Sequence, residues 1–172
     1  CRVFWSAPGR GLPDDGLLQE WLALGQPRPI AGGRFLSQPG LFAWDRIDAA
    51  SALLARHLPT DLAGAGADLG AGYGYLSCEL LSKNPGVTSL DLYEADLRAV
   101  TLARRNVESP RVGLTFEWHD VTRGLPRRYD FIVTNPPFHG QSRVDRPDLG
   151  QRFIEVAGAA VRGGGRLWLV AN

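Results

Sequence analysis

From residue 65 to the end of the chain, short apolar runs of strand length alternate with longer segments that have helical spacing. The first expected strand ends at 68–69, and four further strands span 87–93, 114–118, 129–134 and 166–170. The expected helices span 75–81, 95–106 and 151–161. Strands that alternate with helices pair in parallel through right-handed crossovers. The sequence therefore predicts an α/β fold with a doubly wound, mostly parallel sheet and helices on both faces.

Composition limits the kind of protein this can be. The chain has 172 residues, 44% hydrophobic and 22% charged, which is typical of a globular domain with its own core. It has no apolar run of roughly 18 residues and no signal peptide, so we expect a cytoplasmic protein without a membrane span. Cys1 and Cys78 have neither metal-binding nor redox spacing, and we expect no metal site.

The charge distribution is more informative than the net charge. A formal charge of +1 does not by itself indicate a nucleic-acid binder. Of the 19 basic residues, however, 18 are arginine, which suits phosphate contacts and base stacking. Six of these arginines bracket the segment around Asn135, and a solvated surface is the alternative interpretation: Arg123, Arg127, Arg128, Arg143, Arg146 and Arg152.

The amino-terminal part differs from the rest. Residues 17–24 have helical spacing, and residues 26–33 contain the two prolines and two glycines of a linker. We therefore expect residues 1–30 to be the tail of a preceding domain plus a linker, and 31–172 to be the main domain. The absence of methionine suggests that residue 1 is not the natural start. Asp45 is the expected N-cap of a helix that ends at Pro59.

A glycine-rich turn joins the first strand of the alternation to its helix. Gly70, Gly72 and Gly74 lack side chains, so a ligand can approach the backbone and the helix N-terminus. Glu94 follows Gly72 by 22 residues and ends the next strand, where a carboxylate can accept hydrogen bonds from ribose hydroxyls. This order predicts a nucleoside-containing cofactor, with a purely structural turn as the alternative, and the G-x-G-x-G spacing argues against NAD.

Asp120 closes the third strand at the same edge of the predicted sheet. Its carboxylate could accept from an adenine amino group, with Val121 providing an apolar contact. A solvated acid or a helix cap is the alternative for Asp120. Phe42 and Trp44 lie ahead of the alternating region, and we expect both to pack in the core or in a lid, with a substrate contact as the alternative.

The fourth strand ends in a rigid polar corner at residues 135–138. Pro136 and Pro137 fix φ and end the strand, which places Asn135 at the carboxyl edge where open α/β sheets bind ligands. The amide oxygen of Asn135 and the carbonyl of Pro136 accept hydrogen bonds, and Phe138 adds an aromatic face. Two acceptors beside an aromatic ring suit a planar amine, and an ordinary loop start is the alternative.

In combination, residues 68–74, Glu94, Asp120 and residues 135–138 resemble class I methyltransferases that use S-adenosylmethionine. Three further features narrow this resemblance: Ser-Gln-Pro-Gly-Leu-Phe at 37–42, His139 directly after residues 135–138, and the ending at 163–172. They are similar to the guanine-N2 methyltransferases of ribosomal RNA, both type C, which modifies small-subunit RNA, and type G, which modifies large-subunit RNA.

The resemblance implies a Rossmann-like methyltransferase sheet, which the chain would leave truncated after its fifth strand. It also implies a preceding methyltransferase-like domain in the full-length chain, and ribosomal RNA or a ribosomal subunit as the partner. The cofactor would be S-adenosylmethionine, bound by Asp68, Gly70, Gly72, Glu94, Ala95, Asp120, Val121 and Asn135. The catalytic residues would be Asn135, Pro136 and Phe138, and the substrate contacts Phe138 and His139.

The implied reaction places a flipped guanine on Phe138, with its amine held by Asn135 and the Pro136 carbonyl. It needs no metal and no strong base. Methylation of another planar nitrogen, such as adenine N6 or protein glutamine N5, is one alternative. An inactive duplicate domain that only binds cofactor or RNA is the other.

Overall fold

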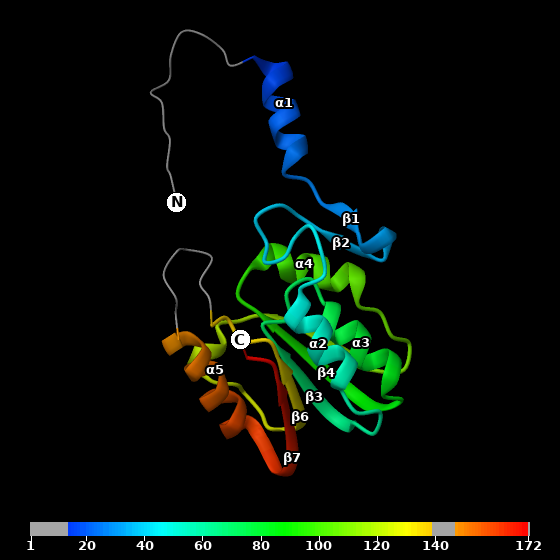
Figure 1. The fold of residues 1–172 in the computed structure, drawn as a ribbon, viewed down its shortest axis with the longest axis vertical. Helices are drawn as coiled ribbons and strands as arrows, with labels where there is room; N and C mark the ends of the chain where they lie inside the picture. Colours follow the sequence, from blue (N-terminus) through cyan, green and yellow to red (C-terminus); the bar gives the residue numbers. More distant parts are fainter. Residues whose placement is uncertain (1–13, 139–146, 172) are drawn as a thin grey trace.

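The computed structural model describes residues 14–138 and 147–171, and its centre is a five-stranded sheet (Figure 1). Every neighbouring pair of strands in this sheet is parallel, in the order β5-β4-β3-β6-β7. The strands are β3 (Ala63–Leu69), β4 (Gly86–Glu94), β5 (Gly113–Trp118), β6 (Tyr129–Thr134) and β7 (Val161–Leu169). The predicted doubly wound parallel sheet is confirmed.

Helices cover both faces of this sheet, as predicted. On one face lie α2 (Ala49–His57), α3 (Tyr75–Lys83) and α4 (Leu97–Asn106). On the other lie α5 (Pro147–Ala160) and the short helix η2 (Val121–Arg123). Helix α5 begins at residue 147 rather than 151, and β7 begins at 161 rather than 166.

The chain winds outward from β3 through β4 to β5, and then returns to the other side of β3 as β6 and β7. The strand order therefore reverses between β3 and β6, which pair directly. At such a reversal the connections leave the two strands toward opposite faces, and this opens a crevice at their carboxyl ends. Leu69 and Thr134 are the paired residues at this edge, immediately before Gly70 and Asn135.

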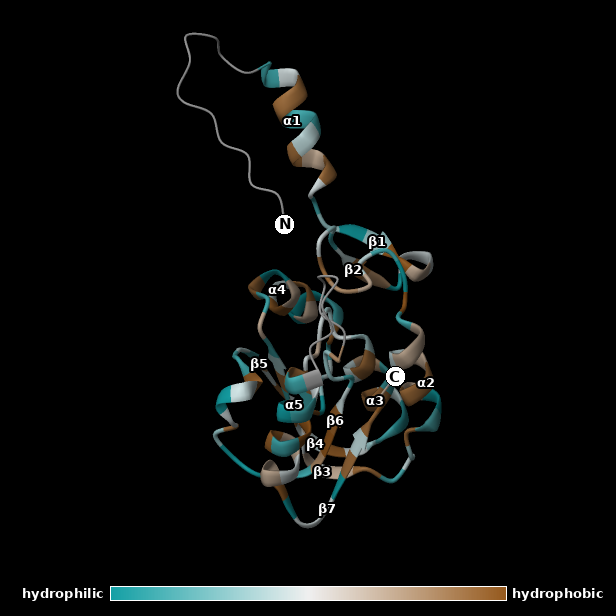
Figure 2. Ribbon diagram, turned by 60° about the vertical axis from the view of Figure 1, so that its left-hand side comes forward, coloured by the Kyte–Doolittle hydropathy of each residue, from teal (hydrophilic) through white to brown (hydrophobic). Residues whose placement is uncertain are grey.

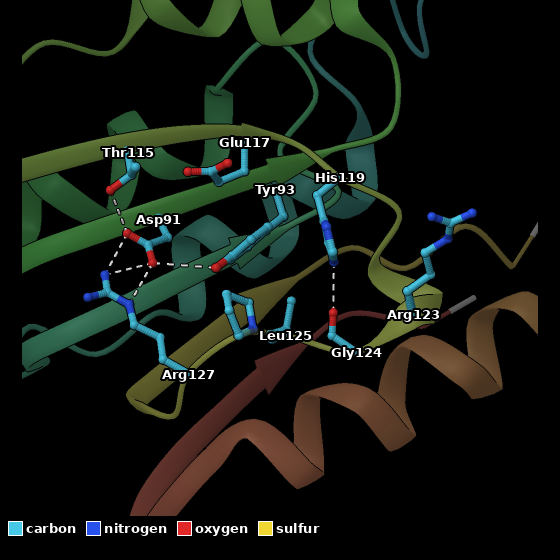
Figure 3. A pocket seen from close by; sticks show the side chains of 10 residues that line it. Asp91, Tyr93, Thr115, Glu117, His119, Arg123, Gly124, Leu125 and Arg127 are labelled. Atoms are coloured by element: carbon cyan, nitrogen blue, oxygen red, sulfur yellow. Dashed lines mark hydrogen bonds and ion pairs between the residues drawn. The ribbon is translucent and has the colours of Figure 1, made fainter.

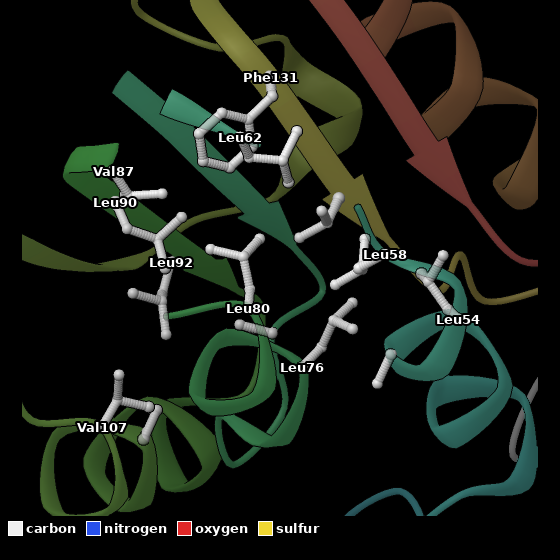
Figure 4. Packing of buried hydrophobic residues seen from close by; sticks show 14 of the residues in the cluster. Leu54, Leu58, Leu62, Leu76, Leu80, Val87, Leu90, Leu92, Val107 and Phe131 are labelled. Atoms are coloured by element: carbon white, nitrogen blue, oxygen red, sulfur yellow. The ribbon is translucent and has the colours of Figure 1, made fainter. Parts of the chain in front are cut away.

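The larger core cluster lies under α2, α3 and α4 (Figure 4). Leu80, Leu90 and Phe131 are at most 1% exposed in this cluster. The ring of Phe131 lies directly over Gly66 of β3, where an added Cβ would collide with the ring. Burying each large side chain contributes about 1.5–3 kcal/mol, so this cluster fixes the strands relative to the helices.

The amino-terminal part contains an antiparallel hairpin where composition suggested a linker. Its strands are β1 (Arg28–Ile30) and β2 (Phe35–Ser37), joined by η1 (Ala31–Gly33). Ile30 and Phe35 are buried in a cluster with Leu102 of α4, so the hairpin packs on the main domain. Pro29 lacks a backbone N–H, which an edge strand of a two-stranded ribbon tolerates.

Helix α1 (Asp15–Leu24) precedes this hairpin and none of its residues is buried. Figure 2 shows hydrophobic residues on α1 at a distance from the rest of the molecule. The expected helical segment is thus confirmed. None of the helices in the described segments has the length and apolar character needed to cross a bilayer.

One predicted cap is wrong. Helix α2 is capped by Asp48, whose Oδ2 accepts from the Ser51 N–H at 2.8 Å, whereas Asp45 pairs with Arg46 in the preceding turn. Residues 43–46 form a turn closed by Arg46 N–H donating to Ala43 O, so the helix begins later than expected. Predictions for Cys1, His139, Arg143 and Arg146 lie outside the described residues.

Candidate active site

A cavity of about 500 Å³ opens at the carboxyl ends of β3, β4, β5 and β6. We call it the Asn135 cavity. It is lined by Phe42, Asp48, Ala50, Gly70, Gly72, Tyr93, Glu94, Ala95, His119, Asp120, Val121, Asn135, Pro136, Pro137, Phe138, Leu149 and Phe153. Apart from Asp68, every predicted site residue among those that the structure describes lies in this lining.

The glycine turn exposes its backbone to this cavity. Gly70 and Gly72 have φ of 71° and 56°, left-handed values that favour glycine. The N–H groups of Gly70 and Ala71 both donate to Tyr93 O, at 2.9 and 3.1 Å, which fixes the turn against β4. A Cβ added to Gly72 would meet no atom within 4 Å, so a ligand can come close to the backbone there.

Glu94 lies opposite this turn and its carboxylate is held at both oxygens. Oε2 accepts from the Gly72 N–H at 2.8 Å, and Oε1 accepts from the Asp96 N–H at 2.9 Å. Each carboxylate oxygen has a second lone pair. Glu94 can therefore accept a pair of ligand hydroxyls without losing its place in the fold.

Asp68 does not line the cavity but lies beneath the glycine turn, 1% exposed. The Ser77 hydroxyl donates to its Oδ2 at 2.6 Å. Burial raises the pKa of Asp68 from 3.8 to about 7, and the nearby charge of Glu94 also raises it. From this position Asp68 can support the glycine turn. It would act on a ligand only through that turn.

Asp120 serves as the N-cap of η2. Its Oδ1 accepts from both the N–H and the hydroxyl of Thr122, at 3.0 and 2.7 Å, and these bonds hold the pKa of Asp120 below its ordinary value. The alternative interpretation of Asp120 as a helix cap is therefore confirmed. Asp120 still lines the cavity, and Val121 beside it is only 2% exposed and presents an apolar surface.

The Asn135 corner is held by hydrogen bonds from three sides. Thr134 Oγ1 donates to Leu69 O at 2.8 Å, which ties the end of β6 to β3. The side-chain Nδ2 of Asn135 donates to Asp48 Oδ2 at 3.0 Å and to Ser51 Oγ at 2.9 Å. The Pro136 carbonyl accepts from the Phe138 N–H at 2.9 Å, and its second lone pair remains for another donor.

Two phenylalanines flank the corner within the cavity lining, Phe42 and Phe138. Phe138 is half-buried, and its ring lies so close to Gly150 of α5 that an added Cβ there would collide with it. Phe42 is 59% exposed and borders the cavity, so it does not lie in the core, and its place in a lid stays a prediction. Trp44 does pack as expected, against the cluster around the hairpin.

Sequence reasoning missed Asp48 and Ser51. Their signal was the spacing of a helix cap, in which an aspartate precedes the residue that donates to it by three positions. Asp45 and Asp48 both precede the helical pattern, and we expected the cap at Asp45. Only the fold shows that the cap faces Asn135, which is 87 residues away in the chain.

A second hollow of about 620 Å³ lies beside β4, β5 and the segment 123–127 (Figure 3). Its charged centre is Asp91, which is 4% exposed and accepts two bonds from Arg127, at 2.8 and 2.6 Å. Thr115 and Tyr129 donate to it as well, both at 2.7 Å. Because these groups satisfy one another, the hollow offers a ligand little that is unpaired.

The described arginines near the corner are largely engaged within the protein. Arg127 pairs with Asp91, Arg152 lies 3.2 Å from Glu155, and Arg123 lies 3.8 Å from Asp120. Within residues 14–138 and 147–171, no group of three or more His, Cys, Asp or Glu side chains could hold a metal ion.

The chain has relatives among proteins of known family. The family model described as Methyltransferase small domain matches residues 32–172. Ribosomal RNA small subunit methyltransferase C from Alcanivorax borkumensis is 33% identical over 167 residues, which cover 94% of this chain and 50% of that protein. The protein of the same name from Pseudomonas aeruginosa is 34% identical over 146 residues, covering 84% and 43%. The chain spans about half the length of the curated relatives it matches, or less.

Among solved structures, the chain is similar to T. thermophilus 16S rRNA N2 G1207 methyltransferase (RsmC) in complex with AdoMet and guanosine. The TM-score is 0.65 at 32% identity, and the match covers 86% of this chain and 41% of that chain. The mitomycin 7-O-methyltransferase MmcR matches with a TM-score of 0.56 at 19% identity, which concerns the fold alone. This second match covers 70% of this chain and 34% of that chain.

Proposed function

Because the chain belongs to the methyltransferase small domain family, we propose that it transfers a methyl group from S-adenosylmethionine to the N2 amine of a guanine in ribosomal RNA. The observation that carries the proposal is that Asn135, the glycine turn and Glu94 line one cavity. The choice of guanine N2 is supported by the likeness to a structure described as a 16S rRNA N2 methyltransferase with AdoMet and guanosine.

The residues of the cavity fit this cofactor. The open backbone at Gly72 would admit the methionine part, Glu94 would accept from the ribose hydroxyls, and Ala95 would border the ribose. The adenine would lie between Asp120 and Val121, and Asp68 would support the turn from below. When bound, S-adenosylmethionine supplies an electrophilic methyl group on a positively charged sulfur.

The chain's own residues would position the amine. The Asn135 side-chain oxygen and the Pro136 carbonyl would accept hydrogen bonds from the two N–H groups of the target amine. These hydrogen bonds would direct the nitrogen lone pair toward the methyl group. Phe138, held against α5 at Gly150, would stack on the flipped base, and His139 would follow as a substrate contact. Positioning of this kind supplies roughly 7–11 kcal/mol of a barrier, and the proton displaced by methylation can leave to water.

The setting of the reaction is part of the same proposal. Since the substrate would be ribosomal RNA or a ribosomal subunit, we expect the enzyme to act in the cytoplasm. We also propose that a methyltransferase-like domain precedes residue 31 in the full-length protein, which is compatible with relatives about twice as long as this chain.

Two variants test the proposal, one through its effect on kcat and the other through its effect on cofactor affinity. Asn135→Ala should lower kcat by roughly 10²–10³ and leave the Kd of S-adenosylmethionine within about threefold of wild type, because the amine loses an acceptor whereas the other residues proposed to bind the cofactor remain. Glu94→Ala should instead weaken cofactor binding, measured by calorimetric titration. If Asn135→Ala lost cofactor affinity in step with activity, the role assigned to Asn135 would be wrong.

A further inference from the structure

The start of helix α2 contacts the side chain of Asn135 through two acceptors. Asn135 Nδ2 donates to Asp48 Oδ2 at 3.0 Å and to Ser51 Oγ at 2.9 Å. We propose that Asp48 and Ser51 are positioning residues for Asn135, and that Asp48 fixes which end of the Asn135 amide faces the target amine. This inference rests on the proposed function and adds two residues that act through Asn135.

The chemistry of an amide explains why such a device is needed. The two ends of an asparagine side chain have nearly the same shape but opposite hydrogen-bonding character. If Nδ2 faced the target amine, two donors would meet and the amine would not be held. A carboxylate only accepts, so the end of Asn135 bound to Asp48 must be Nδ2. The oxygen Oδ1 is then the end left for the substrate.

The charge on Asp48 strengthens this preference. A hydrogen bond to an ionised group is stronger than a neutral one, and losing it would lower the preference for the observed amide orientation by roughly 10-fold to 100-fold. A carboxylate beside Nδ2 also draws the amide toward the form with more negative charge on Oδ1, which makes Oδ1 a better acceptor. Both effects act on the amine nitrogen without any contact between Asp48 and the substrate.

Asp48 is itself held in place by α2. The same Oδ2 accepts from the Ser51 N–H at 2.8 Å as the N-cap of the helix. Asp48, Ser51 and Asn135 are all partly buried, and all three line a small hollow beside the glycine turn. One carboxylate oxygen therefore begins the helix and orients the side chain at the end of β6, so the two elements cannot move independently.

An exchange of the two side chains tests the role of Asp48. Asn135→Asp alone places two carboxylates in contact and should lower kcat by at least 100-fold. Adding Asp48→Asn restores a hydrogen bond in the reversed direction, because the amide at position 48 donates to the carboxylate at position 135. The second oxygen of the carboxylate at position 135 can still accept a hydrogen bond from the target amine. The double variant Asp48→Asn, Asn135→Asp should therefore recover kcat at least tenfold over Asn135→Asp, with little change in the KM of S-adenosylmethionine.

A measurement without turnover separates this inference from the proposed function. In ¹⁵N-labelled, cofactor-free protein, the side-chain amide protons of Asn135, assigned by their loss in Asn135→Ala, should exchange slowly with solvent. Asp48→Ala and Ser51→Ala should each speed that exchange at least tenfold. Asp14→Ala, which removes the corresponding cap of α1, should leave it unchanged.

The outcomes are distinct. Faster exchange in both variants, together with recovery in the double variant, supports the positioning role. Unchanged exchange in Asp48→Ala and Ser51→Ala, or a double variant no better than Asn135→Asp, overturns it even in an active enzyme. A slowly exchanging Asn135 amide in a wild-type protein that methylates no RNA would overturn the proposed function and leave the amide orientation standing.

Discussion

Asp68 is a buried acid whose ionisation opposes folding. Its pKa rises from 3.8 to about 7 in the folded state, chiefly because burial disfavours the charge. Between these two values the folded protein binds a proton that the unfolded chain has lost. Stability therefore decreases as pH rises through this range, and the full cost of the charge is present above about pH 7.

Replacing this acid with its neutral isostere should remove the cost. We expect Asp68→Asn to stabilise the cofactor-free protein by about 2–4 kcal/mol at pH 8 and by much less at pH 4, because the folded wild-type protein then holds the side chain protonated. Chemical denaturation at the two pH values measures this. Asp61→Asn is the control with the opposite sign, because Arg166 lowers the pKa of Asp61. An equal effect of Asp68→Asn at both pH values would contradict the role of burial.

At the level of elements, α5 holds Phe138 through the absence of a side chain at Gly150. An added methyl would collide with the Phe138 ring, whereas at Gly158 of the same helix it would meet nothing within 4 Å. Gly150→Ala should displace the ring and raise the KM for RNA by roughly tenfold, because a misplaced base-stacking ring weakens substrate binding by about 1–3 kcal/mol at most. Gly158→Ala should leave KM unchanged and stabilise the protein by about 0.5–1 kcal/mol through helix propensity.

Steady-state kinetics and thermal unfolding of this pair measure both effects. An unchanged KM in a folded Gly150→Ala variant would show that Phe138 does not contact the substrate. Comparing the two variants also separates an effect on the site from an effect on the helix, because both substitutions add the same methyl group to α5.

The elements could be predicted from sequence wherever a repeated pattern determined them. The apolar runs and the glycine turn predicted β3 to β7 and their helices, although β7 begins five residues earlier than expected. The signal is clearest in β6, because a strand buried on both faces must be continuously apolar. The hairpin at β1 and β2 was missed, because prolines and glycines at 26–33 suit a linker equally well. What makes it a hairpin is the burial of Ile30 and Phe35 against α4, a contact with no local signal.

At the scale of the whole molecule, the parallel topology assembles the site. Because all five strands run in the same direction, Gly70, Glu94, Asp120 and Asn135 come to the same edge of the sheet, and this could be predicted from strand order alone. The contact between Asn135 and α2 could not, since it depends on how a helix that precedes the sheet packs over the strand reversal. Sequence therefore predicted which residues line the cavity better than it predicted the contacts among them.

The identity of the methylated nucleoside decides whether this cavity performs the proposed reaction. Purified protein, S-adenosylmethionine carrying a labelled methyl group, and small-subunit ribosomal RNA lacking the modification are incubated together. The RNA is then digested to nucleosides and analysed by mass spectrometry. We predict label in N2-methylguanosine, lost with Asn135→Ala. Label in N6-methyladenosine, or none from a folded full-length protein on naked RNA and on ribosomal subunits, would contradict the proposal.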